Sequence, residues 1–410
     1  MPRNVHSRHD IVYVKQPTRN LMLAIGVWPF RSEKRSMFQK VYNFFLNFSS
    51  NLLFACEIIP GIIYLLLEES IRIRLQLIPL LLYVFLCAFQ YDIILSRNDN
   101  IRQCWKHVEE DWRNAFGTDD RNIMFRCAKA ARLLILICGV VMYSGVAMYR
   151  IILPLSRGDI VTNQNVTIRP LACPVNFLFI DVQTSPFYEI VFTFQSLTGL
   201  LIVSITTSTY GLLAYFVEHA SGQMKILICL MKNLVQEQWQ KEEEVDKKLS
   251  EVVEHQVRVH SFLQMVQYTM QEICLAEIMV DTLTICLLLY FAILVRIRLQ
   301  DWDTSNPGIV CSYACSIINI IIHIFLFCYT GEQLNDQAEK VAIETRELEW
   351  YHLPEKKMRS VILLMIMSNY PPKISACKIV ELSLKTFGDV REHFQILDRY
   401  PEQSEDYRSD

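Results

Sequence analysis

The chain has 410 residues, of which 52% are hydrophobic, and its formal net charge is −3. Soluble domains contain about 45–50% apolar residues on a count that also includes glycine, and glycine is left out of the figure for this chain. The mean hydropathy of +0.21 and the gathering of apolar residues into long runs predict an integral membrane protein. The small net charge excludes a protein that attracts nucleic acid through a strongly basic surface.

Six apolar segments are long enough to cross a bilayer, and a seventh is marginal, because about 20 apolar residues span the hydrocarbon core as a helix. We therefore predict an all-α membrane protein with seven transmembrane helices, the last of them shortened. The predicted parts are a cytoplasmic N-terminus (1–40), spans one to four (41–217), a cytoplasmic helical loop (218–272), spans five and six (273–330), a cytoplasmic segment (331–373), a partial seventh helix (374–390) and a polar tail (391–410).

Lys and Arg gather in alternate connecting segments, and this asymmetry sets the predicted orientation. The first 40 residues and the segments after spans two, four and six are rich in Lys and Arg, whereas the intervening loops are poor in both. We therefore predict a cytoplasmic N-terminus and an extracellular C-terminus. The sequon Asn165-Val166-Thr167 falls in a loop that this orientation places outside, so Asn165 is a predicted glycosylation site.

Several ionisable or polar residues fall inside the predicted spans. Glu277 and Asp281 lie four residues apart in span five, so both occupy one face of the helix. Carboxylates in the hydrocarbon are costly and usually line water or find a partner. Two interpretations stay open, namely access to water at the cytoplasmic interface and a cation-attracting lining of an aqueous exit. His323 and Asn319 in span six are interpreted as interhelical hydrogen-bonding groups, and Arg150 in span three is expected to extend to the interface.

Aromatic residues lie in the outer halves of the spans under the predicted orientation. As a group they are suited to close an apolar cavity around a small volatile or lipid-like molecule, although each alone is also typical of interhelical packing or of an interfacial belt. The candidate ligand-binding residues are Tyr83, Phe85, Tyr143, Tyr149, Tyr188, Phe192 and Tyr313. The sequence contains no phosphate loop, nucleophile elbow or metal-spaced His pair, so we expect no enzyme, no cofactor and no bound metal.

Several short motifs occur in order along most of the chain and resemble those of the insect odorant receptors. They are Gly26-Val27-Trp28-Pro29, Pro186-Phe187-Tyr188-Glu189 with Gln195, Gly222-Gln223-Met224-Lys225, Gly331-Glu332, Trp350-Tyr351, Leu353-Pro354, Pro371-Pro372 and residues 382–387 (LSLKTF). The resemblance implies a ligand-gated cation channel in which odour-tuned subunits join a shared co-receptor. The short loop between spans four and five resembles that of a tuned subunit.

The resemblance also implies roles for particular parts of the chain. It implies a heterotetramer with an odorant co-receptor in the plasma membrane of a sensory-neuron dendrite, surrounded by lipid. A small volatile ligand would bind among spans two, three, four and six, and the seventh helix would line the pore. The implied pore residues are Ile379, Val380, Ser383, Leu384 and Phe387. The implied subunit anchor, within residues 331–373, includes Trp350, Tyr351, Leu353 and Pro354.

The segment after Phe387 departs from the family pattern. Arg391, Glu392 and His393 follow, and then a run of acidic residues, which leaves the predicted seventh helix at the short limit for a span. The polar tail is interpreted as a variant end or as an error of the gene model. Two other functions remain open: a gustatory-type ligand-gated channel of the same superfamily, and a small-molecule transporter.

Overall fold

The structure is a computed structural model, and it describes residues 7–29, 37–115, 117–157, 160–161, 167–177, 182–236, 242–298, 307–349, 351, 355–369, 375–376, 380–381, 383, 385 and 388. Its helices are α1 (Ser7–Ala24), α2 (Met37–Leu67), α3 (Ile71–Ser96), α4 (Asn98–Asn114), α5 (Thr118–Val146), η2 (Ala147–Ile152), α6 (Leu153–Arg157), α7 (Phe187–Gln236), α8 (Glu242–Arg298), α9 (Pro307–Glu347) and α10 (Glu355–Asn369). Two short antiparallel pairs join β1 (Ile160–Val161) to β2 (Thr167–Ile168) and β3 (Ser375–Ala376) to β4 (Val380–Glu381).

Six of the described helices are long and apolar enough to cross a bilayer, namely α2, α3, α5, α7, α8 and α9. This confirms the predicted all-α class and its six clear spans. Large apolar side chains on the outer faces of α2 and α5 are exposed, among them Phe44, Phe48, Leu136 and Val140. Such faces suit the hydrocarbon of a bilayer rather than water.

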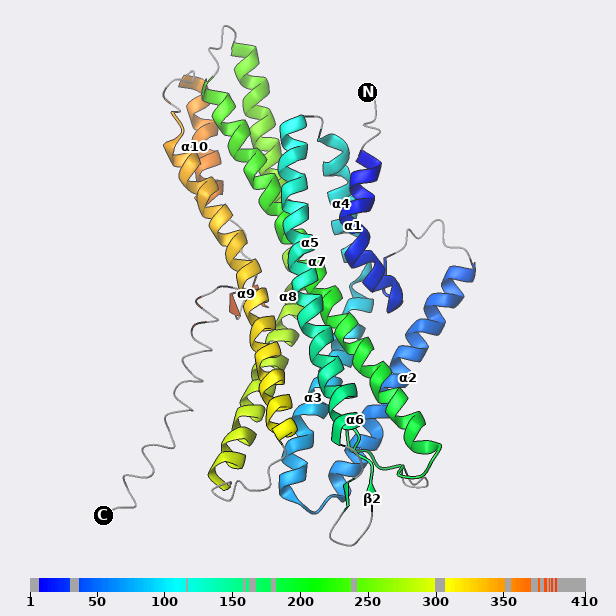
Figure 1. Cartoon of the computed structure of the whole chain (residues 1–410). Helices are drawn as coiled ribbons and strands as arrows, with labels where there is room; N and C mark the ends of the chain where they lie inside the picture. Colours follow the sequence, from blue (N-terminus) through cyan, green and yellow to red (C-terminus); the bar gives the residue numbers. More distant parts are fainter. Residues whose placement is uncertain are drawn as a thin grey trace, which may run out of the picture.

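Two of the spanning helices extend far beyond a membrane. α7 has 50 residues and α8 has 57, which correspond to about 75 and 85 Å at 1.5 Å per residue, against about 30 Å of hydrocarbon. The predicted cytoplasmic loop (218–272) is therefore mostly the continuation of these two helices. Their far ends gather with α10 and the end of α9 at the top of the molecule, whereas β1 and β2 lie at the bottom (Figure 1).

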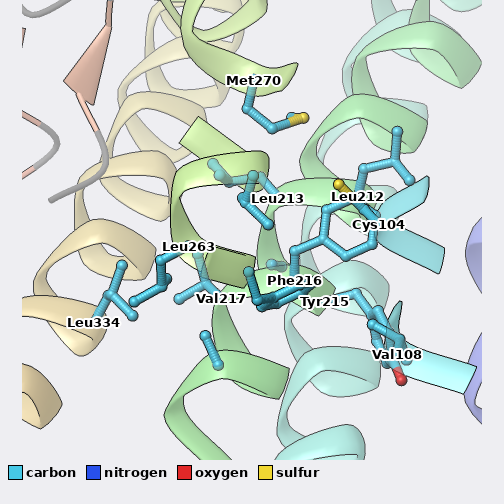
Figure 2. Close-up of a cluster of buried hydrophobic side chains, with 14 of the residues drawn as sticks. Cys104, Val108, Leu212, Leu213, Tyr215, Phe216, Val217, Leu263, Met270 and Leu334 are labelled. Atoms are coloured by element: carbon cyan, nitrogen blue, oxygen red, sulfur yellow. The ribbon is translucent and has the colours of Figure 1, made fainter. Parts of the chain in front are cut away.

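The main hydrophobic core lies where α4, α7, α8 and α9 meet, as Figure 2 shows. Trp105 of α4 stacks on Tyr215 of α7 with ring centroids 4.8 Å apart, and it meets Phe216 edge-on at 5.3 Å. Phe262 of α8 in turn packs against Phe216 at 6.1 Å. Aromatic pairs at these separations add to the burial free energy, so α4 is fixed firmly to the spanning helices.

The predicted seventh helix (374–390) lies mostly outside the described residues. Where the chain is described, Ser375 and Ala376 pair with Glu381 and Val380 as antiparallel strands. Gln267 of α8 donates to the Ser375 carbonyl (2.7 Å) and accepts from its backbone N–H (2.8 Å). The Gln267 side chain thus binds both the backbone N–H and the backbone carbonyl of Ser375 and holds this residue in its extended conformation against α8.

Candidate functional site

A cavity of about 140 Å³ lies inside the bundle. Its walls come from α3 (Pro79, Leu80, Tyr83), α5 (Met142, Gly145, Val146), η2 (Tyr149, Arg150), α7 (Gly199, Ile202), α8 (Asp281, Thr284, Leu288) and α9 (Ser316, Asn319, Ile320). Two glycines let these helices approach one another. A Cβ on Gly145 would stand 2.9 Å from Asn319 Nδ2, and one on Gly199 would stand 3.1 Å from Val146 Cγ1.

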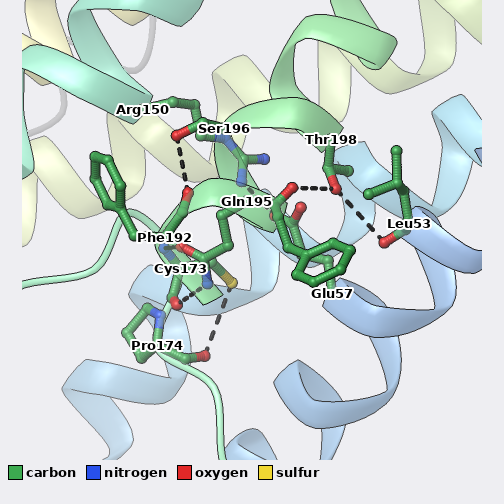
Figure 3. A network of polar contacts seen from close by, with 10 residues as sticks. Leu53, Glu57, Arg150, Cys173, Pro174, Phe192, Gln195, Ser196 and Thr198 are labelled. Carbon is green, nitrogen blue, oxygen red and sulfur yellow. Dashed lines mark hydrogen bonds and ion pairs between the residues drawn. The ribbon is translucent and has the colours of Figure 1, made fainter. Parts of the chain in front are cut away.

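The π-helical segment η2 continues α5 and supplies two of the cavity residues, Tyr149 and Arg150. Such segments are rare and frequently occur at functional sites. Arg150 was expected at the membrane interface, and this prediction is wrong. Its guanidinium is buried and contacts the equally buried carboxylate of Glu57 in α2 at 2.5 Å (Figure 3). The counter-charge from α2 makes the interior position tolerable.

The loop next to this ion pair is held by Gln195 of α7. Its Oε1 accepts from the backbone N–H of Cys173 (3.2 Å), and its Nε2 donates to the Cys173 carbonyl (2.6 Å). The oxygen and the nitrogen of the Gln195 side-chain amide are therefore both used to hold the loop over the end of the bundle near Arg150 (Figure 3).

Glu277, Asp281 and His323 form a buried polar cluster between α8 and α9. His323 Nδ1 lies 2.8 Å from Asp281 Oδ2, and Nε2 lies 3.5 Å from Glu277 Oε1. The carboxylates thus have a partner inside the protein, and Asp281 also lines the cavity. One ligand atom from each residue lies within 4.8 Å of the others. The imidazole is hydrogen-bonded to Asp281 through Nδ1, whereas Nε2 has no hydrogen-bond partner among the described residues.

The structure brings together two of the predicted ligand-binding residues, Tyr83 and Tyr149, in the cavity wall. The Tyr143 hydroxyl instead lies 2.7 Å from the Ser204 hydroxyl, outside the residues that line the cavity. Phe85 is exposed on the outer surface of α3.

The other predicted ligand-binding residues lie away from this cavity or outside the described side chains. Tyr188 donates to the Pro170 carbonyl (3.0 Å) and stacks on Phe192 at 6.2 Å, beside the loop that precedes α7. Tyr313 lies in α9, but its side chain is outside the described part of the chain. The cavity residues that the sequence did not suggest include Thr284. Its spacing of three from Asp281 could have placed it on the same helical face.

Most of the residues that the resemblance assigned to the pore, the anchor and glycosylation lie outside the described residues: Trp350, Leu353, Pro354, Ile379, Leu384, Phe387 and Asn165. Tyr351 is exposed, Val380 belongs to β4, and Ser383 is described outside any helix. The anchor segment nevertheless packs on the bundle through α10. Gln256 of α8 donates to Ser368 Oγ (2.8 Å), and the Thr345 hydroxyl of α9 donates to the same oxygen (3.1 Å).

A second buried charge cluster joins α4, α7 and α8 at Asp111. Its carboxylate meets His219 Nε2 at 2.9 Å and Arg258 Nε at 2.5 Å. Burial alone would raise the pKa of Asp111, but the hydrogen bond and charge of His219, with the charge of Arg258, outweigh burial and lower this pKa. Asp111 therefore remains ionised and ties the three helices together.

The family model described as 7tm Odorant receptor matches residues 75–392, which is most of the chain. The chain belongs to the odorant receptor family. This confirms the resemblance seen in the short motifs, and it makes the protein a multi-pass membrane receptor rather than an enzyme. The six spans and the internal cavity are therefore those of an odorant receptor.

Individual relatives of this odorant receptor are distant in sequence. Odorant receptor 82a of Drosophila melanogaster is 21% identical over 222 residues, which cover 53% of this chain and 54% of the relative. Odorant receptor 2a of the same species is 24% identical over 159 residues, covering 39% of this chain and 38% of the relative. The chain thus spans about half the length, or less, of the curated relatives it matches.

The fold of this odorant receptor is similar to a solved structure over nearly its whole length. The insect olfactory receptor OR5 from Machilis hrabei has a TM-score of 0.72 and 15% identity, and the match covers 95% of this chain and 99% of that one. The structure of the same receptor in complex with eugenol gives a TM-score of 0.73 at 16% identity. At this level of identity the likeness shows the fold.

Proposed function

We propose that this odorant receptor binds a small volatile molecule in its internal cavity and, together with an odorant co-receptor, opens a non-selective cation channel. The observation that carries the proposal is the cavity itself. It lies within the bundle, its walls are mostly apolar, and Tyr83 and Tyr149 project into it. Pockets of this kind, with a few placed polar groups, are typical of small-molecule sites. The complex of Machilis hrabei OR5 with eugenol supports the same use of the fold.

The proposed setting is the plasma membrane of a sensory-neuron dendrite, with the N-terminus in the cytoplasm. Asn165 falls between β1 and β2 in the sequence, and β2 lies at the opposite end of the bundle from α10 (Figure 1). A glycan on Asn165 would therefore place α10 and the long ends of α7 and α8 in the cytoplasm. Loss of a glycosidase-sensitive mobility shift in Asn165→Gln is expected, and a tag before Met1 that antibodies reach on intact cells would contradict this orientation.

The proposed heterotetramer has support from the outer face of α10. Ile362, Leu363 and Ile366 are exposed there, whereas Val361 and Leu364 pack inward. An apolar face at the cytoplasmic end suits contact with a neighbouring subunit, as the anchor assignment of Trp350, Tyr351, Leu353 and Pro354 requires. The assignment of Ile379, Val380, Ser383, Leu384 and Phe387 to the pore belongs to the same proposal.

The test is electrical recording from cells that express this chain with a co-receptor while G-protein signalling is blocked. Odour-evoked current is expected to persist, because binding and conduction belong to one complex. Ile202→Trp, which fills the cavity, should raise the half-maximal odorant concentration by about tenfold or more. Phe85→Trp, on the outer surface, should change this concentration by less than about threefold.

Different results would contradict channel function and binding in this cavity. Current that disappears under the G-protein block would contradict channel function, and equal shifts for Ile202→Trp and Phe85→Trp would contradict binding in this cavity. A response in cells without any co-receptor would favour the gustatory-type homomeric channel instead.

A further inference from the structure

Two clusters of buried ionisable side chains reach the cavity wall, one through Asp281 and the other through Arg150. On α8 and α9, Glu277 and Asp281 face a single imidazole, that of His323. On the opposite side, Arg150 and Glu57 form a buried pair whose charges cancel. Even when His323 is protonated, the first cluster carries one negative charge in excess if both carboxylates are ionised. An uncompensated charge inside a membrane protein is costly, so both carboxylates can be ionised together only when a second positive charge lies beside them. A cationic ligand in the cavity would supply that charge.

The same wall holds hydrogen-bond acceptors that have no partner among the residues that the structure describes. Asp281 uses Oδ2 for His323, which leaves Oδ1 as an acceptor. One turn along α8, the Thr284 hydroxyl is buried and has no hydrogen-bond partner among the described residues. Asn319 of α9 commits Nδ2 to the Cys315 carbonyl (2.8 Å) and so offers Oδ1. A buried polar group that lacks a partner is costly, so a ligand with several hydrogen-bond donors gains most here.

The rest of the cavity wall is apolar, which suits an organic group better than a metal ion. Leu80, Val146, Ile202, Leu288 and Ile320 line the cavity around these polar groups. The volume of about 140 Å³ is close to that of an apolar cavity known to accept benzene, about 150 Å³. The apolar part of the ligand is therefore about the size of one six-membered ring.

We propose that the ligand of this cavity is a small primary amine, bound as its ammonium ion. The positive charge compensates a second ionised carboxylate in the cluster, and the three N–H groups can donate to Asp281 Oδ1, Thr284 Oγ1 and Asn319 Oδ1. A neutral alcohol of the same shape supplies one donor and no charge. The inference rests on the proposed receptor function, since it names the chemical class that the receptor cavity would select.

The test compares three compounds of one shape on cells that express the receptor with a co-receptor: benzylamine, benzyl alcohol and toluene. We expect the half-maximal concentration of benzylamine to be at least about tenfold below that of benzyl alcohol. Asp281→Asn should raise the benzylamine value about tenfold or more, while the benzyl alcohol value changes less than about threefold. Thr284→Val, which leaves the charged cluster intact, should raise the benzylamine value about threefold to tenfold.

Surface labelling of each variant separates a loss of recognition from a loss of folding, and Thr284→Val serves if Asp281→Asn does not reach the surface. Currents evoked by benzyl alcohol or toluene but not by benzylamine would overturn the amine inference and leave the receptor function standing. Equal shifts for amine and alcohol in the variants would also overturn it. Silence toward all three compounds at normal surface abundance would count against the receptor function and the amine together.

Discussion

The ion pair between Glu57 and Arg150 gives the sharpest prediction for stability. Its two side chains come from α2 and η2, they are 2% and 4% exposed, and they contact each other at 2.5 Å. Replacing either residue with methionine removes one charge and leaves the other buried without compensation. Glu57→Met, Arg150→Met and the double variant together form a double-mutant cycle.

The magnitude follows from the burial of the pair. Breaking a buried ion pair from one side costs about 3–5 kcal/mol, whereas replacing both partners with apolar side chains of similar volume is often neutral. The second carboxylate oxygen of Glu57, Oε2, has no hydrogen-bond partner among the described residues, so part of the desolvation cost is already unrelieved. We therefore expect about 3 kcal/mol for each single variant and no more than about 1 kcal/mol for the double variant.

The measurement is thermal unfolding of the purified receptor, followed by loss of its monodisperse chromatographic peak. At about 2 °C per kcal/mol for a large chain, each single variant should lose about 6 °C and the double variant about 2 °C or less. The control is the pair of Arg169 and Glu189, which is 3.2 Å apart but 42% and 52% exposed. Its single methionine variants should lose less than about 1 kcal/mol.

Additive losses of stability in the double-mutant cycle would show that the two charges do not depend on each other. If the double variant lost as much as the two single variants combined, about 6 kcal/mol by the same estimate, then the residues would contribute separately through packing. If the single variants behaved like those of Arg169 and Glu189, the pair would not be buried in the membrane-embedded protein.

Three further predictions concern other parts of the molecule. Gly26 has φ +75°, and a Cβ at this position would stand 2.8 Å from Leu46 Cβ, so Gly26→Ala should cost more than about 2 kcal/mol in thermal unfolding. In the control variant Gly139→Ala, the new Cβ would lie 3.7 Å from Thr207, so this variant should be neutral or stabilising. Equal losses of stability in the two variants would contradict the argument from the backbone conformation of Gly26. Burial lowers the pKa of His107, so the unfolded chain binds a proton first as pH falls below about 6.5. This contribution to wild-type stability should be complete above that pH and should be lost as the pH falls toward the folded-state pKa. Between pH 7.5 and 5.5, the unfolding temperature of His107→Gln should therefore fall less than that of the wild type. An identical fall in both proteins would contradict this prediction. Gln267→Leu removes the hydrogen bonds to Ser375 and should reduce the maximal odour-evoked current more than it shifts the half-maximal odorant concentration. A large shift in the half-maximal concentration with an unchanged maximal current would show that Gln267 acts on binding instead.

The spanning helices could be predicted because the length of an apolar run is itself the signal. α4 illustrates what was missed. Lys and Arg in that segment indicated a cytoplasmic loop, yet Ile101, Trp105, Val108 and Trp112 recur at helical spacing, and all four are buried. The basic side chains of Lys106 and Arg113 are exposed instead, so a count of Lys and Arg typical of a cytoplasmic segment is compatible with a buried apolar stripe.

The cavity could be predicted only in part. Tyr83 and Tyr149 both line the cavity, but Phe85 follows Tyr83 by two residues, and positions two apart do not share a helical face. The burial of Arg150 could not be read from the chain, because its partner Glu57 lies 93 positions away. Only the packing of α2 against the interior brings the two charges together.

The cavity and the segment expected to lead to the pore are joined by one helix. α8 is continuous from Glu242 to Arg298. Asp281 lines the cavity, and Gln267, which holds Ser375, lies 14 positions earlier, or about 21 Å along the axis. Further along, Gln256 holds Ser368 of α10. Because packed helices shift as rigid units, a displacement of α8 at Asp281 reaches both attachment points without passing through a loop. A charge-balancing ligand at Asp281 therefore acts on the same element that positions the chain beyond α10.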